Sequence, residues 1–194
     1  MRIGKGISTA VGFLVLLWAV FFAEGFVPVL STLGINPLDV SSLWHVATAP
    51  LIHANYQHIA GNSVPGAIFA FLIGCRGRRA FWEVTTIVAV VGGAGTWLFG
   101  GIGTNHIGAS GLIYGWLVYP MLRGFYNRSF GEVVLGVILA ITYSGFIWGV
   151  LPNSTGVSWQ YHLFGALGGA IAAASITSDD PPRRAGDRNH LTVR

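Results

Sequence analysis

Three polar side chains in this apolar sequence have the chemistry of a reactive site: Asn62, Ser110 and His162. Ser110 lies within the segment HIGASGLIYG (106–115), at the start of an apolar run. A serine hydroxyl becomes a strong nucleophile when a base takes its proton, and histidine is the most common base in proteins. Backbone N–H groups at a helix start can stabilise the oxyanion that forms when serine attacks a carbonyl. The pair Ser110 and His162 therefore predicts acyl-transfer chemistry.

The composition indicates a protein that crosses a lipid bilayer several times. Of its 194 residues, 53% are hydrophobic and 9% are charged, compared with about 25% charged residues in soluble proteins. Apolar stretches that are long enough to span a bilayer, or nearly so, lie at 7–30, 56–73, 80–99, 110–122, 133–150 and 159–176. We therefore expect an all-α fold, a polytopic bundle of six transmembrane helices within residues 1–177.

Basic residues occur in every second connection between the apolar stretches, and the connections between them have none. All 11 Lys and Arg lie at 2–5, 76–79, 123–128 and 183–194. The positive-inside rule then places both termini in the cytoplasm, in a multi-pass protein of the cell or plasma membrane. The basic N-terminus before an apolar run also fits a signal peptide. Its cleavage would leave five spans with the same alternation of basic and non-basic connections. The polar tail 178–194 is expected to be disordered on the cytoplasmic side.

Several functions are disfavoured by the same composition. The basic residues form no patch with interleaved aromatic side chains, so no nucleic-acid partner is expected. Cys75 is the only cysteine, which excludes an intramolecular disulfide and a thiolate metal cluster. We expect no metal and no other cofactor. The absence of an internal repeat weighs mildly against an inverted-repeat transporter.

The three candidate side chains are predicted to lie at one depth in the bilayer. Counted from the cytoplasmic helix ends at about 1.5 Å per residue, Asn62, Ser110 and His162 lie roughly 20 to 22 Å above the inner boundary. The helix that starts at Ser110 is too short to cross a hydrocarbon core of about 30 Å. The segment 100–109 before it must therefore be enclosed by protein or face water.

None of the seven acidic residues is expected at that depth. We therefore predict a Ser110–His162 dyad, in which a group other than a carboxylate holds the imidazole. Tyr114 lies one turn after Ser110 on the same helical face, so its ring is expected to pack against His162. The pairs Gly111 with Gly115 and Gly165 with Gly169 should let the two helices approach closely.

The motifs around these residues resemble those of the rhomboid family of intramembrane serine proteases. HIAGN (58–62) is similar to the family's H-x-x-x-N, GASG (108–111) to its G-x-S-G, and HLFGALGG (162–169) to its H-x-x-G-x-x-x-G. The order and spacing agree over about residues 7–176. The first outer loop, 31–55, differs because it lacks the Trp-Arg pair of many relatives.

The resemblance implies a role for each matched residue. Ser110 would be the nucleophile and His162 the general base. His58, Asn62 and the backbone N–H of Ser110 would form the oxyanion hole. Supporting positions are Tyr114, which stacks on the base, the motif glycines Gly108, Gly111, Gly165 and Gly169, and His53. For His53 two interpretations stay open, a residue beside a water-filled cavity or an interfacial loop residue.

The resemblance also implies the partners. Substrates would be transmembrane segments of single-pass or multi-pass membrane proteins, reached from the lipid bilayer and unwound at helix-breaking residues. The stretch 133–150 suits a lateral gate or an ordinary lipid-facing helix, and the loop 152–160 suits a cap over the cavity.

Two alternative functions remain at the level of sequence. The first is a related protein that binds membrane clients without cleaving them. The second is a channel or transporter whose pathway is lined by His58, His106 and His162.

Overall fold

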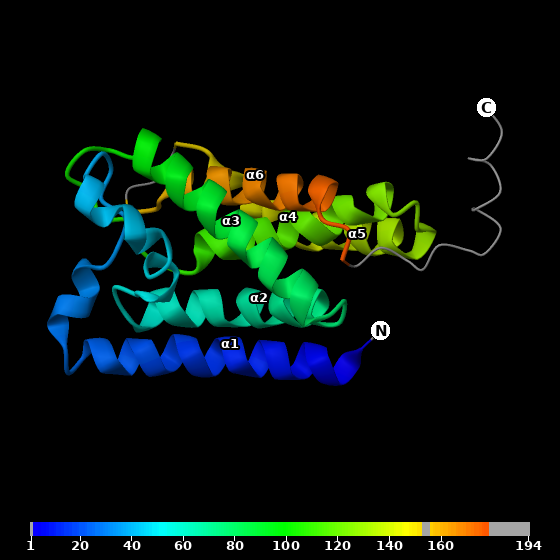
Figure 1. Ribbon diagram of the computed structural model, residues 1–194, viewed down its shortest axis with the longest axis horizontal. Coiled ribbons are helices and arrows are strands. Elements are labelled where there is room, and N and C mark those ends of the chain that lie inside the picture. Colours follow the sequence, from blue (N-terminus) through cyan, green and yellow to red (C-terminus); the bar gives the residue numbers. More distant parts are fainter. Residues whose placement is uncertain (1, 153–155, 179–194) are drawn as a thin grey trace, which may run out of the picture.

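The computed structural model describes residues 2–152 and 156–178, and this part of the chain is helical (Figure 1). The α-helices are α1 (Ile3–Glu24), α2 (Tyr56–Gly74), α3 (Arg78–Phe99), α4 (Ser110–Tyr126), α5 (Phe130–Thr142) and α6 (Trp159–Ser175). Short 3-10 helices are η1 (Pro28–Thr32), η2 (Val40–Val46), η3 (Ala49–Leu51) and η4 (Ser144–Val150). The predicted all-α class is confirmed for these residues, and the expected tail falls outside them from residue 179 on.

Helix α4 is the centre of the bundle. In Figure 1, α1 and α2 lie side by side, α3 crosses obliquely, and α4 and α6 lie against each other. Helix α4 also contacts α2, α3 and α5. Its residues from Gly111 to Leu117 are all buried, as expected for a helix that is apolar on every side. Ser110, at the start of this helix, is therefore held by a rigid element.

Two of the described helices, α1 and α3, are long and apolar enough to cross a membrane by themselves. Helix α5 with η4 would add a third span if the bent pair is counted as one. Helix α4 has 17 residues, a rise of about 26 Å that falls short of a core of about 30 Å. Length and composition alone therefore support fewer spans than the six that the sequence predicts.

The prediction of one helix over 133–150 was wrong. Helix α5 ends at Thr142, and η4 follows at an angle of 66°. Ser144 and Gly145 are weak helix formers, and the tighter turns of a 3-10 helix begin there. The bend directs the backbone carbonyls of Phe146 and Gly149 toward α4 and α6, where they accept hydrogen bonds from side chains.

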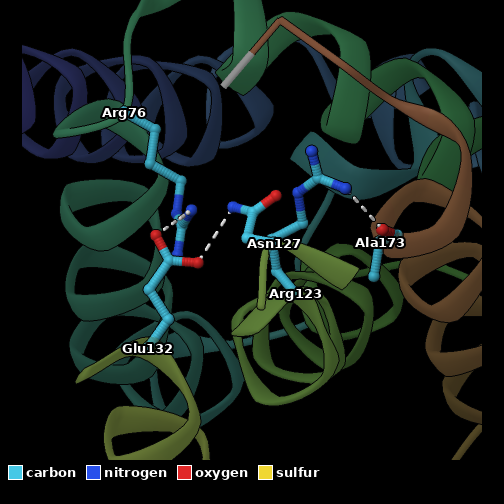
Figure 2. A network of polar contacts seen from close by, with 5 residues as sticks. All are labelled: Arg76, Arg123, Asn127, Glu132 and Ala173. Carbon is cyan, nitrogen blue, oxygen red and sulfur yellow. Dashed lines mark hydrogen bonds and ion pairs between the residues drawn. The ribbon is translucent and has the colours of Figure 1, made fainter. Parts of the chain in front are cut away.

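A polar network joins the helices at the end of the bundle that is remote from Ser110 (Figure 2). Arg76 and Asn127 both donate to the Glu132 carboxylate, over 3.0 Å and 2.9 Å. Arg123, buried in the last turn of α4, donates to the Ala173 carbonyl over 2.8 Å. These bonds link residues at the ends of α2, α4, α5 and α6, so they fix the base of the bundle.

The first outer loop encloses the chain just before Ser110. Ile35 and His106 form an antiparallel bridge with both N···O distances at 2.9 Å, and Gly108 donates its N–H to the Ala49 carbonyl. Ile35 and Ala109 have no exposed surface. Segment 100–109 is expected to be enclosed by protein or to face water; His106, Gly108 and Ala109 are buried, and residues 101–105 are exposed. Leu38, Leu43 and Trp44 of the same loop are exposed.

Candidate active site

Ser110 and His162 lie in direct contact. The Oγ atom of Ser110 is 2.8 Å from Nε2 of His162, although 52 residues separate them in sequence. Ser110 is the first residue of α4, and His162 lies in the first turn of α6. His162 is 8% exposed, so the contact is largely shielded from bulk solvent. This geometry allows a proton to pass from the hydroxyl to the imidazole.

The second ring nitrogen of His162 has a backbone partner. Nδ1 lies 2.9 Å from the carbonyl oxygen of Gly149 in η4. A carbonyl can only accept, so this hydrogen bond requires the proton on Nδ1 and leaves Nε2 as an acceptor for Ser110. The group that orients the imidazole is therefore a peptide carbonyl, whose identity the sequence did not reveal.

The Tyr114 ring lies flat against the imidazole. The two ring centroids are 4.2 Å apart and the ring planes differ by 11°. The Tyr114 hydroxyl donates to the carbonyl of Phe146 over 2.9 Å. Tyr114 and His162 are thus each bonded to η4, which fixes the ring stack from a third element.

Glycines bring α4 and α6 into backbone contact at the predicted positions. A Cβ atom on Gly165 would lie 2.1 Å from the Gly111 carbonyl oxygen, and one on Gly169 would lie 2.2 Å from that of Gly115. Real Cβ atoms do not approach so closely, so larger residues at Gly165 or Gly169 would force the helices apart. The Ser110–His162 distance depends on this close packing.

Gly108 turns the chain into α4 beside two side chains of α2. Its φ angle of +107° lies in the region that favours glycine. A Cβ atom there would lie 2.5 Å from Nε2 of His58 and 3.5 Å from Nδ2 of Asn62. His58 and Asn62 therefore face the same turn that presents Ser110.

His53 lies behind Asn62. Its Nε2 atom is 3.0 Å from Nδ2 of Asn62, and its Nδ1 atom is 3.1 Å from the Leu51 carbonyl. The Glu24 carboxylate accepts the His53 backbone N–H over 3.3 Å. Burial, followed by the nearby His58, lowers the pKa of His53 to about 4. The neutral imidazole accepts from Asn62 and so orients its amide.

A polar cavity of about 670 Å³ opens onto these groups. Ser110, His162, His58 and Asn62 all line it, together with His106 and Ser158. His53 is 4% exposed and is absent from this lining, so it supports the cavity from behind. The loop 152–160 contributes Gly156, Val157 and Ser158, while 153–155 lie outside the described residues.

His106 connects two segments of the chain, a role that the sequence motifs did not predict. Its Nδ1 atom lies 2.5 Å from the Ser158 hydroxyl and its Nε2 atom 2.7 Å from the Thr104 hydroxyl. It therefore joins the turn before α4 to the start of α6. Over residues 2–152 and 156–178, no group of three or more His, Cys, Asp or Glu is arranged to hold a metal.

The apolar helices surround a polar cavity that contains the Ser110–His162 contact, an arrangement that indicates an integral membrane protein. A family model for the Rhomboid domain matches residues 40–178. The chain belongs to the rhomboid family, a family of intramembrane proteases that act on membrane proteins within the bilayer.

Similar proteins occur in mycobacteria and in Bacillus. Uncharacterized proteins of Mycobacterium tuberculosis and Mycobacterium bovis are each 40% identical over 160 residues, which cover 78% of this chain and 67% of theirs. A Bacillus subtilis protein, YdcA, whose name assigns it provisionally to the rhomboid proteases, is 28% identical over 130 residues, which cover 66% of this chain and 64% of its own.

Proposed function

We propose that this protein is an intramembrane serine endopeptidase that cleaves transmembrane segments with a Ser110–His162 dyad. The observation that carries the proposal is the 2.8 Å contact between Ser110 Oγ and His162 Nε2. The Gly149 carbonyl supports it further, because it selects the imidazole tautomer that can accept the serine proton.

The reaction has two halves. Ser110 Oγ attacks the substrate carbonyl carbon while its proton passes to His162 Nε2. The imidazolium then gives that proton to the leaving amine as the C–N bond breaks, which leaves an ester on Ser110. Water from the cavity attacks the ester, loses a proton to His162 and releases the acid, and the proton returns to Ser110.

The oxyanion hole is formed by the Ser110 backbone N–H together with His58 and Asn62. Ser110 is the first residue of α4, so its N–H has no carbonyl partner within the helix. One N–H of the Asn62 amide bonds to His53, and the other remains for the substrate oxygen. Loss of one such donor typically lowers the rate about 100- to 1,000-fold.

The substrates are single-pass or multi-pass membrane proteins. A peptide bond inside a helix is shielded by the helix's own hydrogen bonds, so the segment must unwind to enter the cavity. Residues 1–177 form the six-span protease core in this proposal, with both termini in the cytoplasm. Arg76, Arg123 and Arg128 do not line the cavity, which supports this orientation.

The proposal is tested with purified protein in proteoliposomes that also hold a single-pass reporter with a Gly- or Pro-containing span. Wild type should cut the reporter within its span, Ser110→Ala should not, and Ser8→Ala, which removes an exposed hydroxyl on α1, should match wild type. Cleavage by Ser110→Ala at the wild-type rate would overturn the proposal. Binding of intact reporter by wild type would favour the client-binding alternative, and proton or metal flux without cleavage would favour the channel.

A further inference from the structure

A second cavity, of about 510 Å³, lies between α1 and α3 and is separate from the active-site cavity. Phe13 of α1, Phe81 and Trp82 of α3 and Trp116 of α4 line it. None of its lining residues also lines the cavity of Ser110 and His162. In Figure 1, α1 lies beside α2, whereas α3 crosses away from α2 and contacts α6.

The groove presents a hydrocarbon surface although three hydroxyl residues line it. The Ser8 and Thr9 hydroxyls donate to the Lys5 carbonyl over 3.0 Å and 2.7 Å. The Thr85 hydroxyl accepts the indole N–H of Trp116 over 3.1 Å. These polar groups are satisfied within the protein, so the groove suits an apolar occupant.

Positive charge gathers at one end of the groove. Arg78 lines it directly, and Lys5 lies one turn before Ser8 and Thr9 on α1. The Arg2 guanidinium lies beside Gly77, the residue before Arg78. The ion pairs among the described residues join Arg76 to Glu132 and Arg79 to Glu83, and none involves Arg2, Lys5 or Arg78.

The stretch of α3 that lines the groove is about as long as one leaflet, and the first outer loop lines the end away from Arg78 with Val46, Ala47, Pro50 and Leu51. Along α3 the groove extends from Arg78 to Ala89, a rise of roughly 17 Å at 1.5 Å per residue. Half of a hydrocarbon core of about 30 Å is nearly the same length. The exposed Trp82 lies close to the charged end, where an indole ring prefers the membrane interface.

We propose that this groove binds one anionic glycerophospholipid from the leaflet on the basic side of the protein. An acyl chain lies against Phe13, Phe81 and Trp116, and the phosphate lies at Arg78, flanked by Lys5. A transmembrane substrate is a less suitable occupant, because Ser110 lines the other cavity. Anionic lipids are attracted to basic residues at the cytoplasmic surface, which supplies the charge complementarity.

The test measures photocrosslinking in phosphatidylcholine vesicles that contain a trace of phosphatidylglycerol with a diazirine on one acyl chain. Two matched pairs of variants are made in the full-length Ser110→Ala protein, so that the result does not depend on proteolytic activity. Gly12 lines the groove with open space around it, so Gly12→Leu fills the groove, and Gly4→Leu is its control at a position outside the lining. Arg78→Gln removes the proposed phosphate partner, and Arg79→Gln removes the neighbouring charge.

We expect crosslinks on α1, α3 and α4 residues of the groove. Gly12→Leu should lose most of them, and Arg78→Gln should lower them about fivefold, the effect of one basic residue near an anionic surface. Gly4→Leu and Arg79→Gln should match the parent. Equal crosslinking in all variants, or equal crosslinking by a phosphatidylcholine probe, would overturn the proposal, as would displacement of the lipid by a transmembrane substrate peptide.

Discussion

The Nδ1 atom of His162 lies 2.9 Å from the carbonyl oxygen of Gly149, so a residue of α6 is oriented by the backbone of η4. The same 3-10 segment accepts the Tyr114 hydroxyl at Phe146. Because both hydrogen bonds end on η4, its displacement would release His162 and the Tyr114 ring together. The position of η4 therefore determines whether His162 is held as a proton acceptor.

Gly149→Ala should lower activity without unfolding the protein. An added Cβ would lie 1.9 Å from the Tyr114 hydroxyl and 3.1 Å from His162 Nδ1, so η4 must shift and its carbonyl must leave the imidazole. A positioned base contributes roughly 100- to 10,000-fold to the rate, and we expect kcat to fall by part of that factor. Gly145→Ala is the control, because a Cβ at Gly145 meets nothing within 4 Å. Reporter cleavage that is equal in both variants would contradict the role of the carbonyl.

Gly108→Ala should impair the oxyanion hole. The residue must keep a φ of +107°, and its Cβ would press on His58 Nε2 at 2.5 Å. We expect a loss of kcat of about 100-fold, the usual effect of a lost oxyanion donor. Gly103→Ala imposes a similar φ strain at +80° but in open space, so its activity should stay near wild type. Cleavage kinetics of the two variants, measured side by side, decide the matter, and unchanged kcat in Gly108→Ala would refute the prediction.

Gly165→Ala should destabilise the bundle. Its Cβ would lie 2.1 Å from the Gly111 carbonyl oxygen, which separates α4 from α6. Overpacking of this kind costs about 1 to 3 kcal/mol. Thermal melts in detergent should show a lower Tm, whereas Gly131→Ala, in open space on α5, should melt at or above the wild-type temperature. A Tm for Gly165→Ala at the wild-type value would show that the helices tolerate greater separation.

The contribution of His53 to stability should depend on pH. Its pKa is about 4 in the folded protein and 6.5 ordinarily, so the fold favours the neutral ring that accepts from Asn62. This stabilisation is present above pH 6.5 and is lost as the pH falls toward 4. The Tm difference between wild type and His53→Leu should therefore shrink over that range. A difference that is constant from pH 7 to pH 4.5 would contradict the assignment.

Tyr114→Phe and Tyr114→Leu should separate the ring from the hydroxyl. Phenylalanine keeps the stack on His162 and loses the hydrogen bond to Phe146, which is worth about 1 kcal/mol. Leucine loses both. We expect Tyr114→Phe to retain most of the cleavage activity and Tyr114→Leu to lose most of it. Equal activities would mean that ring stacking does not position the base.

The contacts that depend on side-chain type could be predicted from the sequence. Ser110, His162 and Tyr114 meet because their spacing from the helix ends fixes their depth and face. The glycines of α4 and α6 pair because small residues recur every four positions, which marks a close helix contact.

The features that depend on the backbone could not be predicted. Every residue has a carbonyl, so no pattern marks that of Gly149 as the partner of His162. The break after Thr142 lies within a continuous apolar stretch, and hydrophobicity does not distinguish a straight helix from a bent pair. The position of His53 behind Asn62 depends on the path of the outer loop. The sequence of that loop has no periodic pattern from which the path could be predicted.

The central claim, that Ser110 is a nucleophile activated by His162, is tested most directly by reaction with a fluorophosphonate and mass mapping of the adduct. We predict one adduct, on the Ser110 hydroxyl, that is absent from Ser110→Ala and strongly reduced in His162→Ala. Equal labelling of wild type and both variants, or an adduct on another residue, would contradict the claim.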